Sequence, residues 1–359
     1  MTPFPTRYAE ARSRFLDAAR ARGAEPVTYT NPERGADGEE LATDVVRIGH
    51  PDARFALVVA SGTHGVEGPC GSGIQVRMLE DGLGVDLGDD VALVLIHAHN
   101  PYGFSHARRV TEEGVDLNRN FVDFTAPLPR NPGYDELHEH LVPSAWNGPA
   151  RAAADTALAE FRERHGARAY QSAIVDGQWQ HPTGLFYGGT GPTWAHRTIR
   201  TIARNHLAGF QHVAFLDLHT GLGPRGHGEL IHSHDPHGPE YARVQGWYGE
   251  VTNTEAPEGG DSVSTRVVGT IDRGYREELA AGALSFVVVE YGTVPVDDVI
   301  GGLRLDHHVA AHASDDTALR EAARDAMLHA FFGADARWQQ DVWQRARDVG
   351  ARAIAGMRG

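Results

Sequence analysis

The sequence predicts an α/β protein in which a mostly parallel or mixed central sheet is flanked by helices on both faces. Four short apolar runs, at residues 55–60, 91–96, 213–218 and 286–289, have strand character without the alternation of a half-exposed strand. Continuous apolar runs suit strands that are covered on both faces. Helical periodicity at residues 152–165, 193–206 and 317–332 predicts the covering layers.

The two ends of the sequence are predicted to be helical as well. Residues 6–22 carry apolar side chains among charges in a helical rhythm, which Gly23 ends, and residues 336–357 indicate a final amphipathic helix. Residues 125–189 are rich in Pro, Trp, His and Gly around a helical centre, which indicates an insertion over one end of the sheet. Without an internal repeat, a linker or a shift in composition, residues 1–359 are expected to form a single domain.

Charge and hydropathy narrow the class of function. The 33 basic and 48 acidic residues give a net charge of -15, which argues against a general affinity for nucleic acid or anionic membranes. Residues 1–26 lack the apolar run of a secretory signal, and no later stretch approaches the roughly 20 apolar residues of a membrane span. We therefore expect a cytoplasmic protein that acts on a small molecule, either as a monomer or as an oligomer.

A single cysteine, Cys70, limits the ways in which a metal could be held. One cysteine excludes an internal disulfide and a thiolate cluster, so histidine and carboxylate would have to bind any metal, and 21 histidines are available. Ligands of open α/β sheets gather at the carboxyl ends of the strands. The residues directly after each apolar run are therefore the candidates.

His64 and Glu67 follow the first apolar run on a Gly- and Pro-rich turn, where a helix is not expected. An imidazole and a carboxylate three residues apart can point at one centre, and zinc accepts both; an incidental surface histidine is the alternative. His219 ends the third run, in Asp-Leu-His, as a third ligand or as a buried structural histidine. Two histidines and a glutamate would leave a fourth zinc position open for water, which is typical of catalytic zinc.

Glu290 directly follows the last apolar run and is the candidate for proton transfer. Partial burial would raise its pKa toward the working pH, whereas a salt bridge to an arginine is the alternative. The segment that begins at Asp116 and contains Asn118 and Arg119 is dense in Asn and Arg. Guanidinium groups pair bidentately with carboxylates, so the segment indicates an anion-binding wall; a solvated loop with structural Asn turns is the alternative.

Taken together and in order, these motifs resemble those of the zinc carboxypeptidases (M14-like) and the succinylglutamate desuccinylase/aspartoacylase group. The resemblance covers residues of about 50–295, rests on His-x-x-Glu, Asp-x-Asn-Arg-Asn, Asp-Leu-His and a strand-terminal Glu, and is closest to a branch of bacterial proteins, the DUF2817 family. It implies one zinc ion per chain, held by His64, Glu67 and His219, with Glu290 as the general base and acid.

The resemblance also implies roles for the Asn- and Arg-rich segment. Asn118 and Arg119 match the pair that grips the terminal carboxylate of a carboxypeptidase substrate. Arg109 matches the arginine that polarises the scissile carbonyl, although Arg108 adjoins it in the sequence. Asp116 matches an aspartate that orients the first zinc histidine through its other ring nitrogen.

One feature departs from the carboxypeptidase pattern. Those enzymes have a mobile tyrosine a little over twenty residues before the catalytic glutamate, and residues 262–270 contain none. Tyr275 and Tyr187 are the candidates to replace it in substrate binding, although neither has the matching position. Residues 181–189 are expected to form a substrate lid or a packed aromatic turn.

The sequence therefore favours a zinc-dependent hydrolase that cleaves an amide bond in a small carboxylate-bearing substrate. A carboxypeptidase acting on a small peptide and a deacylase acting on an N-acyl amino acid both fit the motifs. A non-catalytic binding protein on the same fold is a third possibility, although all three ligands and the base are present. A serine hydrolase is disfavoured, because the sequence has no Gly-x-Ser-x-Gly motif.

Overall fold

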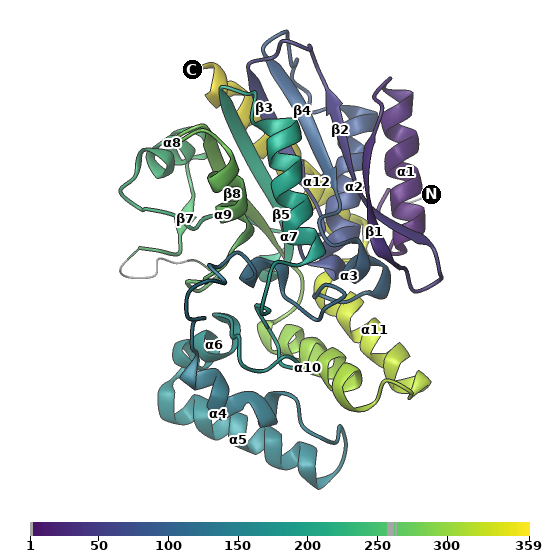
Figure 1. Cartoon of the computed structure of the whole chain (residues 1–359), viewed down its shortest axis with the longest axis vertical. Coiled ribbons are helices and arrows are strands. Elements are labelled where there is room, and N and C mark those ends of the chain that lie inside the picture. The colour runs from purple at the N-terminus through teal and green to yellow at the C-terminus, as the bar shows by residue number, and fades with distance from the viewer. Residues whose placement is uncertain (1–2, 257–261, 263) are drawn as a thin grey trace.

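An eight-stranded mixed sheet forms the centre of the protein (Figure 1). The computed structural model describes residues 3–256, 262 and 264–359. The strand order is β1-β2-β4-β3-β5-β8-β6-β7. The strands are β1 (Val27–Arg34), β2 (Glu40–Ile48), β3 (Phe55–Ala60), β4 (Val91–His97), β5 (His212–Arg225), β6 (Gly228–His232), β7 (Thr252–Asn253) and β8 (Leu284–Gly292).

Helices surround this sheet on both faces and beyond one end (Figure 1). They are α1 (Tyr8–Ala21), α2 (Gly68–Asp81), α3 (Pro101–His106), α4 (Pro132–Leu141), α5 (Pro149–His165), α6 (Ala167–Val175), α7 (Trp194–Ile202), α8 (Pro239–Tyr248), α9 (Ile271–Glu278), α10 (Val296–His312), α11 (Thr317–Phe331) and α12 (Ala336–Arg358), with short helical turns η1 (Gly65–Glu67), η2 (Leu117–Arg119) and η3 (Ala203–Leu207). Among the described residues, no helix combines the length and apolar composition that a membrane crossing requires.

The four apolar runs form the parallel centre of the sheet, which confirms the predicted fold class. They lie in β3, β4, β5 and β8, and neighbouring strands in the order β4-β3-β5-β8 are parallel. Leu57 and Val59 of β3 point into one core, with side chains of α1, α2, α8 and α12. Ala56 and Val58 point into a second core with α7 and α9. Both faces are therefore covered, as continuous apolar strands require.

The predicted helices are present, but other elements had no clear signal in the sequence. The predicted segments correspond to α1, α5, α7 with η3, α11 and α12. Helix α2 was not predicted because its Gly-rich start is typical of a turn. These glycines permit close packing instead: a Cβ atom at Gly68 would lie 2.3 Å from the Phe104 ring, and one at Gly73 would lie 2.1 Å from the Phe4 ring.

The segment expected to be an insertion forms α4, α5 and α6 (Figure 1). These helices share a third apolar core with α10 and α11, which includes Leu137, Leu158, Ile300 and Met327. Helix α10 follows β8 directly, so this group of helices lies beyond the carboxyl end of the central parallel strands. The chain thereby covers the edge of the sheet where ligands of α/β proteins bind.

Candidate metal and catalytic site

The ends of three parallel strands bring the predicted site residues together. The turn that carries Thr63, His64 and Glu67 follows the end of β3. Ala60, the last residue of β3, pairs with Asp217 of β5. In the next pair of strands, His219 of β5 lies opposite Glu290 of β8. Residues paired in register on parallel strands point to the same face. The register therefore sets the glutamate beside the histidine.

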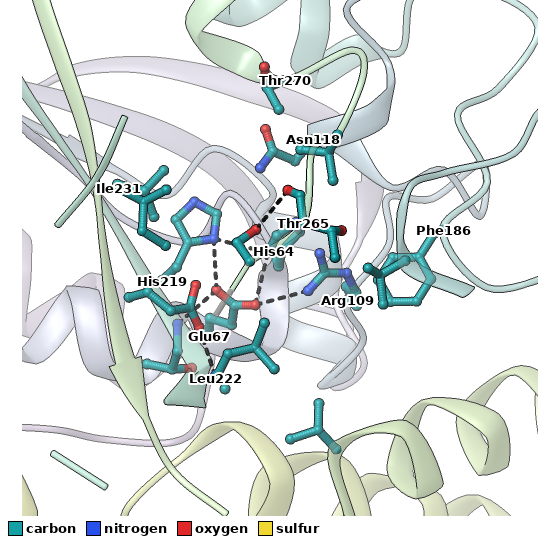
Figure 2. Close-up of a pocket in the computed structure, with 18 of the residues that line it drawn as sticks. His64, Glu67, Arg109, Asn118, Phe186, His219, Leu222, Ile231, Thr265 and Thr270 are labelled. Atoms are coloured by element: carbon teal, nitrogen blue, oxygen red, sulfur yellow. Dashed lines mark hydrogen bonds and ion pairs between the residues drawn. The ribbon is translucent and has the colours of Figure 1, made fainter. Parts of the chain in front are cut away.

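His64, Glu67 and His219 converge on one point, as Figure 2 shows. The Nδ1 atoms of the two histidines lie 3.2 Å apart. His64 Nδ1 lies 2.8 Å from Glu67 Oε1, and His219 Nδ1 lies 3.2 Å from Glu67 Oε2. All three side chains are buried, with 2–3% of their surface exposed.

This arrangement of the three side chains fits a tetrahedral metal ion. Zinc bonds of about 2.0–2.2 Å separate neighbouring ligand atoms by about 3.3 Å, close to the spacings found here. The ring nitrogens that face away also lie near acids: His219 Nε2 lies 2.5 Å from Asp217 Oδ2, and His64 Nε2 lies 3.2 Å from Asp116 Oδ1. The second contact does not meet hydrogen-bond geometry, so His64 Nε2 has no hydrogen-bond partner among the residues that the structure describes. Carboxylates in these positions orient metal-binding histidines.

Asp217 links His219 to a buried polar chain. Its Oδ1 atom accepts a hydrogen bond from the Thr63 hydroxyl at 2.7 Å, and that hydroxyl lies 2.9 Å from His99 Nδ1. His99 Nε2 in turn lies 2.8 Å from the Tyr275 hydroxyl. All of these side chains are buried. This series of polar contacts fixes the orientation of Asp217 and, through Asp217, the orientation of the His219 ring.

We expect Asp217→Asn to weaken metal binding by about 10–100-fold, the effect typical of losing a carboxylate that orients a metal-binding histidine. The amide keeps the shape of the aspartate but removes its charge. Competition with a chelator measures the affinity, and Asp52→Asn, which makes the same change at an exposed position, is the control. Equal affinities of Asp217→Asn and the wild type would contradict this role.

Electrostatics favour positive charge at the centre of the site. Burial alone would lower the pKa of His219, but the adjoining carboxylates of Asp217 and Glu67 outweigh it and hold that pKa well above its ordinary value. Burial, followed by the negative charge of Glu67, raises the pKa of Glu290 to about 7. Glu290 Oε1 accepts a hydrogen bond from the backbone N–H of Leu222 at 2.9 Å. A carboxyl group of this pKa can both accept and return a proton near neutral pH.

Of the two adjacent arginines, Arg109 is the one that faces the site. Its Nε atom donates to Asp116 Oδ2 at 2.9 Å, and its Nη1 atom donates to Glu67 Oε1 at 3.2 Å. Arg108 instead donates from Nε to both carboxylate oxygens of Asp306, at 3.0 Å each. Arg109 also lines the cavity around the three metal-ligand candidates, whereas Arg108 does not.

Arg119 and Asn118 line the same cavity. The Arg119 side chain is buried, and its nitrogens donate to the carbonyls of Val175, at 2.6 and 3.2 Å, and Asn118, at 2.8 Å. Within the described part of the chain, no acidic side chain forms an ion pair with it, and burial lowers its pKa to about 10. Asn118 Oδ1 accepts from Ile271 N–H at 2.9 Å, so its amide nitrogen is the group left to donate to a ligand.

Phe186, which the sequence did not single out, contacts both arginines. Its ring centroid lies 5.1 Å from the Arg109 guanidinium carbon and 5.5 Å from that of Arg119, within cation–π range. Its φ is 55°, a conformation that costs a bulky residue about 1–3 kcal/mol. Gln178 helps to hold it there, because the Gln178 N–H donates to the Phe186 carbonyl at 3.2 Å.

Residues 181–189 form a packed aromatic turn, the second of the two expected structures. Gln178 Nε2 donates to the carbonyls of His181, at 2.8 Å, and Leu185, at 3.2 Å. His307 Nδ1 of α10 lies 3.0 Å from the carbonyl of Thr183. Leu185 and the next two side chains are buried, and Phe186 is the residue of the turn that lines the cavity.

The two tyrosines expected to bind substrate do not lie in the cavity, which corrects that prediction. Tyr275 lies on α9 and is fully buried against the sheet, and its hydroxyl contacts His99. Tyr187 is 6% exposed and its backbone carbonyl accepts from Asp116 N–H at 2.8 Å, but its side chain is not among those that line the cavity. Of the two neighbours in the turn, Phe186 lines the cavity instead, because the backbone of the turn directs its side chain there.

Asp217 could have been recognised from the sequence. It precedes His219 by two residues in an apolar run, and residues two apart on a strand share a face. Thr63 and His99 carried no such signal, because their contacts with Asp217 and with one another join three separate segments.

The chain is similar in fold to carboxypeptidase A from Helicoverpa armigera, with a TM-score of 0.50 and 13% identity over 98% of this chain and 74% of that chain. A metallo-carboxypeptidase from Burkholderia cenocepacia is 14% identical (TM-score 0.39; 89% of this chain, 68% of that chain). An aspartoacylase family protein from Mesorhizobium loti is 13% identical (TM-score 0.37; 80% of this chain, 67% of that chain). No curated protein matches the chain in sequence.

The protein has an α/β fold like that of carboxypeptidase A, and at the carboxyl edge of its sheet a buried His-Glu-His set could hold a metal ion. The chain belongs to the family described as "Protein of unknown function (DUF2817)", whose model matches residues 4–345. This match confirms the resemblance that the motifs indicated.

Proposed function

We propose that this protein is a zinc-dependent hydrolase that cleaves an amide bond in a small substrate carrying a carboxylate. The observation that supports it most directly is the convergence of His64, Glu67 and His219 at the spacing of tetrahedral ligands. Glu290 lies beside His219 in the sheet register, with a pKa suited to proton transfer. A structural metal site would need no such proton-transfer group.

The side chains around the three ligands have complementary tasks. Zinc, when bound, would act as a Lewis acid and activate a water molecule. Glu290 would accept a proton from the attacking water and give it to the leaving amine. Arg109 would donate a hydrogen bond to the carbonyl oxygen as negative charge develops on it.

Asn118 and Arg119 would bind the carboxylate of the substrate. Arg119 is a buried cation that forms no ion pair with an acid among the described residues, and an incoming carboxylate would supply one. Asn118 would add the hydrogen bond from its amide nitrogen. Both a small peptide and an N-acyl amino acid offer such a carboxylate next to the scissile amide.

The purified protein should contain one zinc ion per chain, and His64→Ala and His219→Ala should lose it, because each variant removes one of three ligands. Elemental analysis measures the zinc, and circular dichroism confirms the fold of each variant. His237→Ala, at an exposed histidine, is the matched control and should keep its zinc. Stoichiometric zinc in folded His64→Ala and His219→Ala proteins would refute the assignment.

A further inference from the structure

One wall of the cavity is an apolar stripe on α10. Val296, Val299, Ile300 and Leu303 all line the cavity. The other three follow Val296 by three, four and seven residues, which places all four on one face of the helix. Val296 is 39% exposed, whereas the other three are at most 7% exposed. Apolar surface is thus presented to whatever occupies the cavity.

This stripe, the α10 wall, lies across the site from Asn118. In Figure 2 the helices that follow β8 lie on one side of His64, Glu67 and His219, and Asn118 and Thr270 lie on the other. A carboxylate bound at Asn118 therefore directs the opposite side of the scissile amide, its acyl side, toward α10. The acyl group would meet apolar side chains there.

The α10 wall also lacks a partner for a cation. The acidic residues that line the cavity, within the described ranges, are Glu67, Asp272 and Glu290. Glu67 belongs to the metal-ligand set, and Glu290 is the proposed base. Asp272 lies on α9 and forms an ion pair with Arg276 at 3.0 Å. A free ammonium group against α10 would therefore be desolvated without a counter-ion, which is costly.

We propose that the α10 wall is a subsite for the acyl group of the substrate, and that it selects uncharged, apolar acyl groups. This inference rests on the proposed function and makes it more specific. It favours N-acyl amino acids over dipeptides with a free amino terminus, because only the dipeptide places an ammonium group against α10. Substrates with longer aliphatic acyl groups should bind more tightly, because these groups contact more of the stripe.

Three amides of leucine test this: N-hexanoyl-, N-acetyl- and N-glycyl-leucine share a carboxylate and differ only in the acyl group. We expect kcat/KM of the zinc-loaded protein to be at least about 10-fold higher for hexanoyl than for acetyl or glycyl, since even one well-placed methylene can be worth that much. Val296→Asp places a charge on the wall and should reduce the hexanoyl-to-glycyl ratio by about 10-fold or more. Ala310→Asp, an exposed position on the same helix, should leave the ratio unchanged.

Calorimetric binding of the three amides to zinc-loaded Glu290→Gln protein separates this inference from the proposed function. Tighter binding of hexanoyl-leucine with no hydrolysis of any amide by the wild type would support the acyl subsite on α10 and refute the proposed hydrolase function. Equal binding and equal turnover of all three amides would overturn the proposed acyl subsite. A hexanoyl-to-glycyl ratio of kcat/KM that Val296→Asp does not change would overturn it as well. Preferred binding and cleavage of glycyl-leucine would overturn it in favour of peptide substrates.

Discussion

Glu290→Gln should retain its zinc and lose turnover by a factor on the order of 10²–10⁴, the range typical of removing a general base. Glutamine keeps the size of the side chain and can still accept the hydrogen bond from Leu222 N–H. It cannot take a proton from water at neutral pH. Three other side chains form the metal-ligand set, so the metal should not depend on this residue.

Elemental analysis and steady-state kinetics on the same protein sample measure the two effects together. Glu163→Gln, which makes the same change on the exposed face of α5, controls for the loss of one negative charge. If Glu290→Gln turned over substrate at nearly the normal rate, the proton-transfer role would be wrong. If it lost its zinc, Glu290 would be a metal ligand.

The second large effect concerns the carboxylate of the substrate. Converting it to a neutral amide should reduce kcat/KM of the wild type by roughly 10²-fold or more, because Arg119 would be left buried without its anion. The guanidinium is already held by the carbonyls of Val175 and Asn118, so it cannot turn to another partner without losing those bonds. An acid and its matched amide, assayed side by side, measure the preference.

Arg119→Met should abolish the preference for the acid, and Arg119→Lys should restore only part of it, because a point charge cannot reproduce the planar guanidinium. The ratio of the two substrates within one variant cancels any general loss of activity from the substitution in a buried position. Equal cleavage of acid and amide by the wild type would contradict carboxylate recognition. If Arg119→Met kept the preference for the acid over the amide, a residue other than Arg119 would be the one that recognises the carboxylate.

Local sequence patterns were sufficient for the elements that bury apolar surface in a regular way. The four central strands are continuous apolar runs, and α1, α5, α11 and α12 have clear helical periodicity. Helix α2 is different, because its Gly68 and Gly73 lie against the rings of Phe104 and Phe4, and such contact has no local signature. Positions directly after apolar runs also identified His64, Glu67, His219 and Glu290, because ligands bind where parallel strands end.

The sequence by itself was sufficient to place His64, Glu67, His219 and Glu290 at the carboxyl edge of the sheet, since strand ends and the period of two residues are local properties. Only the tertiary structure decided that Arg109 rather than Arg108 faces the cavity, and that Phe186 rather than Tyr187 lines it. Adjacent residues in a turn have no fixed periodicity, so their directions follow from contacts such as Arg108 with Asp306, which lies 198 residues away. The α10 wall likewise exists as a subsite only because the fold places that helix across from Asn118.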